Sequence, residues 1–366
     1  MTGVQTCALP IYLTNLTTHE RPGVYSSYDA STLVRGSGGH KTVGLAAINS
    51  TASAGVPITV TSYEAAVAAF GSQESKQDMA ELIRIALLNG AAAVVAVPVA
   101  NEEGYQAAFD TLGGLENISV MLCDSTTLTV QQALRDSVLS ASAARRERIA
   151  VVGAAAGEDV SALVERAKGL NCERMVLVAP GSVDGEDAAQ DGLSAAAAVA
   201  GAIAAQSDPA IPLGGAELLG LKGLSAQYSD NDIDLLVRGG VTPLESISGQ
   251  VGVVRGVTTR TSSGEVEDTT WRELSTILIV DDVIPTLRDS LRSKFRRAKN
   301  TAQSRGAIRT QVVLELENKK SREIITDYDQ VTVSAHPDDP TVCLVDFTFT
   351  VTHGLNQIWL TAHIVI

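Results

Sequence analysis

Histidine is the side chain most often used as a general base, and its distribution in this chain is uneven. The five histidines are His19, His40, His336, His353 and His363, so none lies between residues 41 and 335. The Gly-x-Ser-x-Gly motif of hydrolases and the Gly-x-x-x-x-Gly-Lys-Ser/Thr phosphate loop are both absent from the sequence. We therefore expect no catalytic residues in the central part of the chain.

Two loops and one acidic segment are the remaining candidates for binding a ligand. Residues 149–159 (IAVVGAAAGED) read as a strand, a glycine-containing turn and a helix start, but they lack Gly-x-Gly-x-x-Gly spacing. We interpret them as a tight turn, and 178–185 as a surface loop. Asp230, Asp232 and Asp234 alternate as in a calcium loop, yet the glycine and distal glutamate are missing, which favours a solvated turn leading into a strand. No cofactor and no metal are expected.

Composition narrows the class of protein further. The four cysteines are far apart, which predicts neither a disulfide framework nor a zinc site, and Cys123 and Cys172 are expected to be inert core thiols. The chain has 366 residues and a net charge of −14, which argues against a general nucleic-acid binder. No apolar stretch qualifies as a membrane span, so no direct membrane insertion is expected.

Between residues 42 and 240, short apolar runs alternate with helix-type segments. Ser62 is a typical helix N-cap and Gly71 a typical stop. Apolar strands without alternation, separated by amphipathic helices, predict a doubly wound α/β domain whose parallel sheet is covered on both faces. Its strands are expected at 42–48, 57–61, 91–97, 118–123, 148–153 and 175–179, and its helices at 63–70, 76–88, 102–112, 130–144, 160–169 and 187–206.

The pattern changes after about residue 207. Ile233–Arg238 and Val251–Thr261 read as strands, and Trp271–Asp281 as a strand or a short helix. Pro285 can occupy the first turn of a helix that runs to about Ser304. We expect the chain to finish in β-type segments.

Those final segments alternate in polarity. In 342–353, apolar residues alternate with Asp346, Thr348, Thr350 and Thr352, which predicts a half-buried strand. A second alternating segment, 357–366, ends with the printed chain and has no polar cap, so it invites pairing with a partner edge. The apolar residues are Val345, Phe347, Phe349 and Val351 in the first segment, and Ile358, Leu360, Ala362, Ile364 and Ile366 in the second.

A basic segment stands out in this acidic chain. Residues 285–309 hold eight cations against the single acid Asp289: Arg288, Arg292, Lys294, Arg296, Arg297, Lys299, Arg305 and Arg309. A solvated helix face is the ordinary explanation, and an anionic partner surface is the alternative. Nucleic acid is the weaker candidate, because the remaining negative charge would repel phosphates.

The N-terminal residues divide into two parts. Residues 1–11 (MTGVQTCALPI) resemble the conceptual translation of a common sequencing-adapter oligonucleotide joined to a truncated reading frame, so we expect an artefact there, including Cys7. Residues 12–41 are polar and rich in Gly, Ser and Thr, with one turn signal at Arg21-Pro22-Gly23. They predict an extended arm with one or two short strands.

Several segments, in this order and spacing, resemble the contractile tail sheath proteins of bacteriophages and of phage-like contractile bacteriocin particles. The resemblance covers most of 21–366. The segments are RPGVY at 21–25, SDP at 207–209 followed by PL at 212–213, YSD at 228–230, LVRGGVTP at 236–243, VRGVTTRT at 254–261, IVDDVI at 279–284 and KNT at 299–301.

The resemblance implies both a fold and a function. The family's α/β domain is subtilisin-like, and the missing histidines agree with a non-catalytic relative. Sheath subunits form stacked hexameric rings around an inner tube and contract to drive it through a target envelope. Their partners are other copies, the tail tube protein, and baseplate and tail terminator proteins. The location implied is a virion tail or phage-like particle, assembled in the bacterial host cytoplasm.

The resemblance also implies roles for particular residues. Val24 and Tyr25 of the N-terminal arm, and the 357–366 strand arm, would be donated to the sheets of neighbouring subunits. Val345, Phe347, Phe349 and Val351 would belong to the receiving sheet of a C-terminal α+β domain at 241–356. Arg288, Arg292, Lys294, Arg296, Arg297 and Lys299 would face the tube.

Two alternatives remain open from the sequence. One is an α/β nucleotide-binding protein or hydrolase that oligomerises. The other is one half of a two-protein secretion sheath, against which a single chain with both the α/β and the C-terminal sheet regions counts.

Overall fold

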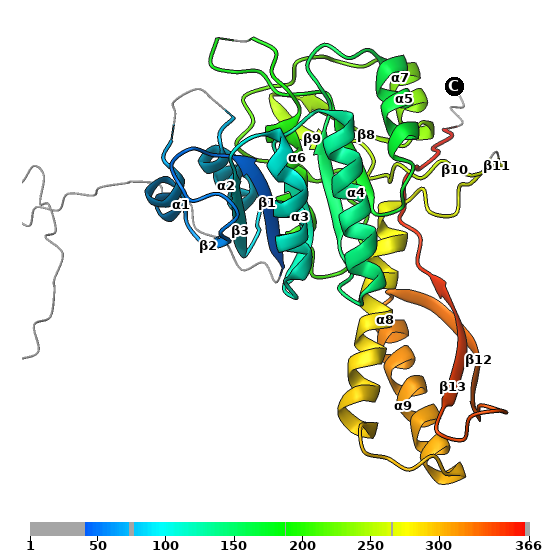
Figure 1. Cartoon of the computed structure of the whole chain (residues 1–366). Coiled ribbons are helices and arrows are strands. Elements are labelled where there is room, and N and C mark those ends of the chain that lie inside the picture. Colours follow the sequence, from blue (N-terminus) through cyan, green and yellow to red (C-terminus); the bar gives the residue numbers. More distant parts are fainter. Residues whose placement is uncertain (1–40, 73–76, 187, 265, 363–366) are drawn as a thin grey trace, which may run out of the picture. The chain divides into compact units, whose positions relative to one another are not determined.

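The computed structural model describes residues 41–72, 77–186, 188–264 and 266–362, and its main feature is a nine-stranded sheet (Figure 1). The strand order is β2-β3-β1-β4-β5-β6-β8-β9-β7, in which the six from β3 to β8 run parallel. β2, β9 and β7 pair antiparallel at the two ends. The strands are β1 (Thr42–Ile48), β2 (Ile58–Val60), β3 (Ala93–Val99), β4 (Ile118–Cys123), β5 (Ile149–Gly153), β6 (Met175–Ala179), β7 (Glu217–Leu218), β8 (Val241–Ile247) and β9 (Gln250–Val253).

Helices cover both faces of this sheet, so the expected doubly wound arrangement is present. One apolar core contains residues of α1, α2 and α6, and the other contains residues of α3, α4 and α5. The helices are α1 (Tyr63–Phe70), α2 (Met79–Leu88), α3 (Tyr105–Gly114, preceded by the 3-10 turn η1, Glu102–Gly104), α4 (Leu128–Ala143), α5 (Val160–Leu170), α6 (Leu193–Ala205) and α7 (Asp230–Arg238).

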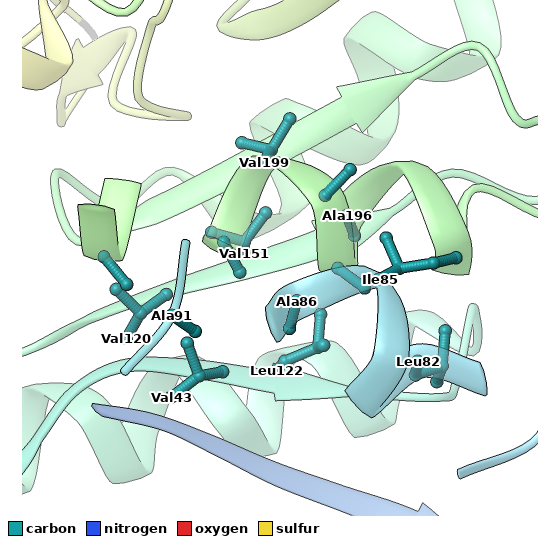
Figure 2. Packing of buried hydrophobic residues seen from close by; sticks show 14 of the residues in the cluster. Val43, Leu82, Ile85, Ala86, Ala91, Val120, Leu122, Val151, Ala196 and Val199 are labelled. Atoms are coloured by element: carbon teal, nitrogen blue, oxygen red, sulfur yellow. The ribbon is translucent and has the colours of Figure 1, made fainter. Parts of the chain in front are cut away.

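The core on the α2 and α6 side shows why the strands lack alternation. Val43 of β1, Leu122 of β4 and Leu82 of α2 belong to this core, in which Val43 lies beside Ala91 and Val120 (Figure 2). Ala46 of β1 belongs to the opposite core. A strand buried on both faces needs apolar residues at every position. Gly201 lets α6 approach α2 closely, because a Cβ at this position would stand 2.4 Å from the carbonyl oxygen of Ala86.

Several helices and strands have the bounds that the sequence predicted, and capping residues explain the helix ends. The Ser62 side chain accepts a hydrogen bond from the amide of Ala65, and α1 spans the predicted 63–70. Asp159 caps α5 in the same way, and Asn171, with a φ of 34°, ends that helix in the left-handed region. Strands β4 and β6 also have the bounds that the sequence predicted.

The strand predicted at 233–238 is wrong, because these residues belong to helix α7. Ser229 and Asp232 form a reciprocal capping box at its start, so the aspartates at 230, 232 and 234 lie in a helix rather than in a turn leading to a strand. The following strand is β8, which pairs with β6. The sheet therefore continues past residue 240, where the predicted α/β segment ended.

The helix predicted from Pro285 to Ser304 is also wrong in its bounds. Helix α8 runs over Leu274–Phe295 with Pro285 inside it, and a second helix, α9 (Ala302–Ser321), begins at the Thr301 cap. Packing outweighs the cost of an interior proline here, because α8 is buried on both sides of Pro285: Val283 before it is fully buried, and Leu287 after it is only 5% exposed.

The C-terminal unit consists of α8, α9 and a two-stranded antiparallel sheet, which lie together at the lower right of Figure 1. Its strands are β12 (Ile325–Ala335), which the sequence did not predict, and β13 (Cys343–Val351), which it did. A short hairpin, β10 (Ser262–Ser263) and β11 (Val266–Glu267), precedes α8. Of the strand predicted at 251–261, only the first residues are extended, in β9.

Residues 352–362 follow β13 without helix or strand, so the strand predicted at 357–366 is not formed in the described part of this single chain. The predicted arm at 12–40 and residues 363–366 lie outside the described residues. No helix among the residues that the structure describes is long and apolar enough to cross a membrane.

Candidate assembly surface

Open α/β sheets bind ligands at their switch point, where the strand order reverses. That point lies at the carboxyl ends of β1 and β4. Asp124 follows β4 and accepts hydrogen bonds from the Tyr105 hydroxyl at 2.5 Å and from the amide of Ile48 at 2.8 Å. Burial raises the pKa of Asp124, although these two hydrogen bonds oppose the shift. The polar groups of the crevice thus bond to one another.

The turn after β5 is filled by the protein's own groups as well. A Cβ on Gly153 would lie 2.3 Å from the carbonyl of Gly192, so glycine is required there by the close approach of this backbone. The amide of Ala156 donates to Asp191 Oδ1 at 2.8 Å, and the amide of Ala155 to Glu158 Oε2 at 3.2 Å. A phosphate loop presents such amides to its ligand, whereas here two carboxylates accept them.

The described residues hold no group of three or more His, Cys, Asp and Glu side chains that could bind a metal ion. Cys123 and Cys172 are both buried. Burial raises the pKa of the Cys123 thiol to about 12 and that of Cys172 to about 11. Both side chains therefore stay protonated at neutral pH and are poor nucleophiles.

The sheet of the C-terminal unit brings the predicted receiving residues together. Val345, Phe347, Phe349 and Val351 share one face of β13 and pack against a small core formed by α8, α9 and β12. Phe347 and Phe349 stack with their ring centroids 6.2 Å apart. The alternate residues are exposed, so β13 is half-buried as the sequence predicted.

The edges of this sheet are open among the described residues, since no third strand pairs with either β12 or β13. The β12 edge is interrupted, because its register shifts between Asp329 and Thr332, and Gln330 has a φ of 54°. The Arg309 side chain also donates to the carbonyl of Val331 at 2.9 Å. The ladder between β13 and β12 is regular from Thr332 to Ala335.

The segment after β13 exposes several large apolar side chains. Four of them are 75–90% exposed: Leu355, Ile358, Trp359 and Leu360. Trp359 is one of only two tryptophans in the sequence. Ala362 is exposed too. A Cβ on Gly354 would lie 2.8 Å from Pro212, so glycine permits close contact between this segment and the loop after α6. Val24, Tyr25, Ile364 and Ile366 lie outside the described residues.

The predicted basic helix is divided between two helices and the connection that joins them. Arg288 is paired with Glu147 at 2.5 Å, and Lys294 donates to Gln311 of α9 at 2.6 Å, so both are engaged within the chain. Arg292 lies on the last turns of α8. Arg296, Arg297 and Lys299 are exposed in the connection and have no partner among the described residues.

Ion pairs that the sequence did not reveal attach α8 to its surroundings. Arg174, just before β6, binds Asp281 with both ends of its guanidinium, at 2.6 and 2.8 Å. Lys319 of α9 binds the adjacent Asp282 at 2.5 Å. Burial raises the pKa of Asp281 despite the opposing effect of Arg174. The sequence feature that could have indicated these ion pairs is the two consecutive acids, Asp281 and Asp282, within the apolar run ILIVDDVI.

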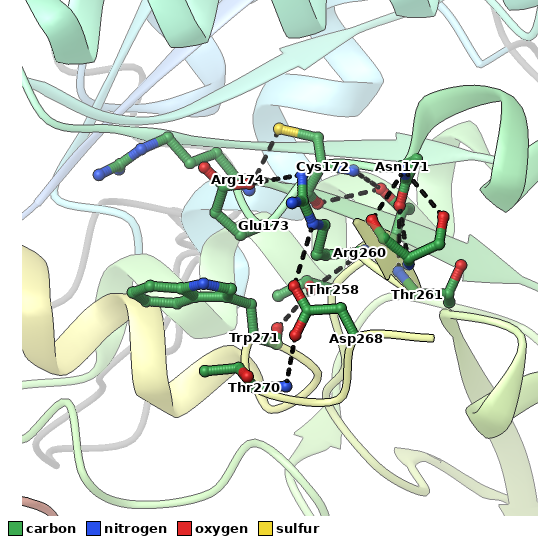
Figure 3. A network of polar contacts seen from close by, with 12 residues as sticks. Asn171, Cys172, Glu173, Arg174, Thr258, Arg260, Thr261, Asp268, Thr270 and Trp271 are labelled. Atoms are coloured by element: carbon green, nitrogen blue, oxygen red, sulfur yellow. Dashed lines mark hydrogen bonds and ion pairs between the residues drawn. The ribbon is translucent and has the colours of Figure 1, made fainter. Parts of the chain in front are cut away.

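A polar network secures the segment that leads into α8 (Figure 3). Asn171 accepts from the amides of Thr261 and Ser262, and its own amide group donates to the Ser262 carbonyl. Thr258 donates its hydroxyl to the Trp271 carbonyl at 2.7 Å. The motif VRGVTTRT is therefore a structural anchor between the sheet and the C-terminal unit.

The polar groups at the strand ends are thus paired within the chain, whereas the two-stranded sheet and the segment after β13 are open among the described residues. Comparison with known proteins identifies the family. Two consecutive family models match, the phage tail sheath protein central domain over residues 99–259 and the phage tail sheath C-terminal domain over residues 266–365. Together they span most of the sequence. The chain belongs to the phage tail sheath family.

A curated relative is the tail sheath protein of Bacillus phage SP01, which is 28% identical over 228 residues. The match covers 60% of this chain and 38% of the relative. Solved structures share the fold at low identity. A chain of the six-fold symmetrised anti-feeding prophage baseplate has a TM-score of 0.74 at 16% identity, covering 95% of this chain and 100% of that one. The sheath tail protein of Desulfitobacterium hafniense has a TM-score of 0.67 at 13% identity, covering 90% and 100%.

Proposed function

We propose that this chain is the structural subunit of a contractile tail sheath. It polymerises as stacked hexameric rings around an inner tube and contracts to drive the tube through a target envelope. The observation that carries the proposal is an open two-stranded sheet in the same chain as an exposed, alternating apolar segment. Family membership supports it, and a contracted sheath of an extracellular contractile injection system has the same fold, with a TM-score of 0.71 at 13% identity.

The links between subunits are donated strands. Residues 352–366 can span about 50 Å when extended, far enough to reach another subunit. Ile358, Leu360 and Ala362 would then share one face of the added strand, with Ile364 and Ile366 continuing it, and Val24 and Tyr25 would act in the N-terminal arm. Backbone hydrogen bonds to the open edge supply affinity, and the apolar face meets the side of the sheet that carries Phe347 and Phe349.

The tube contact uses the connection between α8 and α9. Arg296, Arg297 and Lys299 are its three free cations, and each exposed ion pair is worth only about 0–1 kcal/mol. Repetition around each ring makes such contacts hold collectively, yet they release when the sheath contracts. Arg288 and Lys294 are engaged within the chain and are not part of this contact. Other tail components, including baseplate and terminator proteins, would cap the polymer.

The α/β region would be a non-catalytic, subtilisin-like scaffold. The absence of histidine from residues 41–335 and the internally paired groups at Asp124 and Gly153 support this role over a hydrolase or nucleotide-binding protein. The setting is a virion tail or phage-like particle assembled in the host cytoplasm.

Truncation before Ile358 tests the strand links. We expect folded particles that no longer form striated cylinders in negative-stain electron microscopy. Ile358→Asp together with Leu360→Asp should have the same effect, because both charges fall on the apolar face of the added strand. Thr361→Asp is the matched control on the opposite face and should assemble. Cylinders from the truncated chain would refute strand donation, and serine-hydrolase labelling or a nucleotide-induced rise in melting temperature would favour the enzyme alternative.

A further inference from the structure

The segment that follows β13 is held at its base by two contacts within three residues. The hydroxyl of Thr352 donates to the carbonyl of Glu323, just after α9, at 2.6 Å. Two residues further on, Gly354 lies against Pro212 in the loop after α6. The first contact is to the C-terminal unit, and the second is to a loop that comes from the α/β region. The base of the segment is therefore fixed between these two parts of the chain.

The contact between Gly354 and Pro212 leaves no room for a side chain. A Cβ on Gly354 would lie 2.8 Å from Cβ, 2.9 Å from Cγ and 3.3 Å from Cδ of the Pro212 ring. Gly354 is not among the glycines with a positive φ, so its backbone conformation is open to other residues. Glycine is thus required here by the closeness of the proline ring and not by the backbone dihedral angles.

Pro212 is itself held in place from both sides. Ala210 is 9% exposed and belongs to the small core of the C-terminal unit, whereas Leu213 is 4% exposed and belongs to the core that contains α2 and α6. The Asp208 side chain accepts a hydrogen bond from the amide of Ala210 at 2.9 Å. The proline ring also fixes its own φ. The loop is therefore a firm support, and an added side chain at Gly354 would displace the exposed segment rather than the loop.

The segment has no comparable support beyond this point. Gly354 is partly buried, whereas every residue from Leu355 to Ala362 is exposed. The contacts at Thr352 and Gly354 therefore set the direction in which the following residues leave the chain. A segment that leaves in one direction loses less conformational entropy on pairing with a neighbour than one that leaves in many. In a symmetric polymer, each copy must also send its segment toward the same place on the next copy.

We propose that the contact between Gly354 and Pro212 positions the C-terminal arm, residues 355–366, for donation to a neighbouring copy. This inference rests on the proposed strand donation. It adds two positioning residues that lie outside both the donated strand and the receiving sheet. It also gives a role to the segment SDP at 207–209 with PL at 212–213, which carries part of the resemblance to sheath proteins.

Gly354→Ala tests the contact, with no tube protein present. Displacing the arm should raise the concentration needed for self-assembly by about three- to tenfold, measured by sedimentation of a dilution series. The melting temperature of the single chain should not change, because the displaced residues are exposed. Gly114→Ala is the matched control, since a Cβ at this exposed position would meet no atom within 4 Å. Normal assembly of Gly354→Ala, or a melting temperature that falls together with assembly, overturns the proposal.

Substitutions of Pro212 provide the second test. Pro212→Gly removes all three ring carbons that the new Cβ would meet, so it should restore most of the self-assembly lost in Gly354→Ala. Pro212→Ala keeps Cβ, the atom that would be approached most closely, and should not restore it. Equal assembly of Gly354→Ala with and without Pro212→Gly overturns the proposal, because the two positions would then act independently. Strand donation itself fails separately, if the chain truncated before Ile358 still forms cylinders.

Discussion

The α/β region and the C-terminal unit use their polar and apolar groups in opposite ways. In the α/β region, groups at strand ends bond to one another, and two extensive cores cover both faces of the sheet. Among the described residues, the C-terminal unit has a small core, open sheet edges and an exposed apolar segment after β13. The first arrangement stabilises a single chain, whereas the second leaves backbone groups and apolar side chains that a further strand can still pair with.

The largest expected effect lies in the α/β core. Leu122→Ala removes a side chain that is 1% exposed between α2 and α6, and we expect a loss of about 2–5 kcal/mol in the free energy of unfolding. Leu139→Ala, at a position 37% exposed on α4, should cost less than about 0.5 kcal/mol. Urea titration followed by circular dichroism measures both. Equal losses would show that burial between the sheet and its helices does not determine how much each leucine contributes to stability.

Arg148 offers the next test, because its charge is buried without a carboxylate. Arg148→Met would remove the guanidinium donors to the carbonyls of Leu112 and Leu115 at the end of α3, and only Leu112 would keep a second donor, the amide of Leu115. We expect a loss of about 2–4 kcal/mol in the free energy of unfolding. The same urea titration reports it. Arg135→Met serves as control, since this side chain is more exposed and bonds at longer distances to Gly169 and Leu170. An unchanged free energy of unfolding for Arg148→Met would mean that the cost of burying the Arg148 charge cancels the stability gained from its hydrogen bonds.

What the sequence predicted well depended on local signals. Ser62 and Gly71 gave both ends of α1, and continuous apolar runs located five of the six parallel strands, all except β8. The error at 233–238 had a local signal too, because Ser229 and Asp232 have capping-box spacing, but the apolar residues around it suggested a strand. Helix α8 could not be predicted in full, since packing against distant residues carries it through Pro285.

Only part of the candidate surface was predicted, again because local patterns were visible in the sequence and long-range contacts were not. Alternation in β13 correctly grouped Val345, Phe347, Phe349 and Val351 on one face. Strand β12 was missed because acidic and polar residues occupy most of ITDYDQVTVSA, in which only two positions are buried. Charge density alone also could not show that Arg288 is paired with Glu147, 141 residues away in the chain.

A smaller effect is expected at Asp124, and it depends on pH. Burial raises the folded-state pKa above 3.8, so the folded state binds a proton more readily than the unfolded state. The stability gained from protonation is fully present only below pH 3.8, and it is lost as the pH rises through the raised pKa. Asp124→Asn removes this titration, while its amide can donate to Tyr105 and its oxygen can accept from Ile48.

Free energies of unfolding of the natural chain and of the Asp124→Asn variant, measured between pH 4 and pH 7, test this prediction. The Asn variant should be more stable than the natural chain at pH 7, and the difference should shrink toward pH 4. Asp110→Asn, at an exposed position on α3, is the control and should show no such trend. A difference that grows as the pH falls would mean that the hydrogen bonds from Tyr105 and Ile48 outweigh burial.

The smallest effect on stability is expected at the α8–α9 connection, where the change appears only in the presence of a partner. Arg296→Glu, Arg297→Glu and Lys299→Glu together should leave the unfolding free energy within about 0.5 kcal/mol, because these side chains are exposed and unpaired in the single chain. Sheath assembly should persist, while attachment to the tube protein should weaken and lose its dependence on salt. Co-sedimentation with the tube at two ionic strengths measures this. Lys168→Glu, on α5, controls for a change in net charge, and unchanged, salt-insensitive attachment of the triple variant would remove the connection from the tube contact.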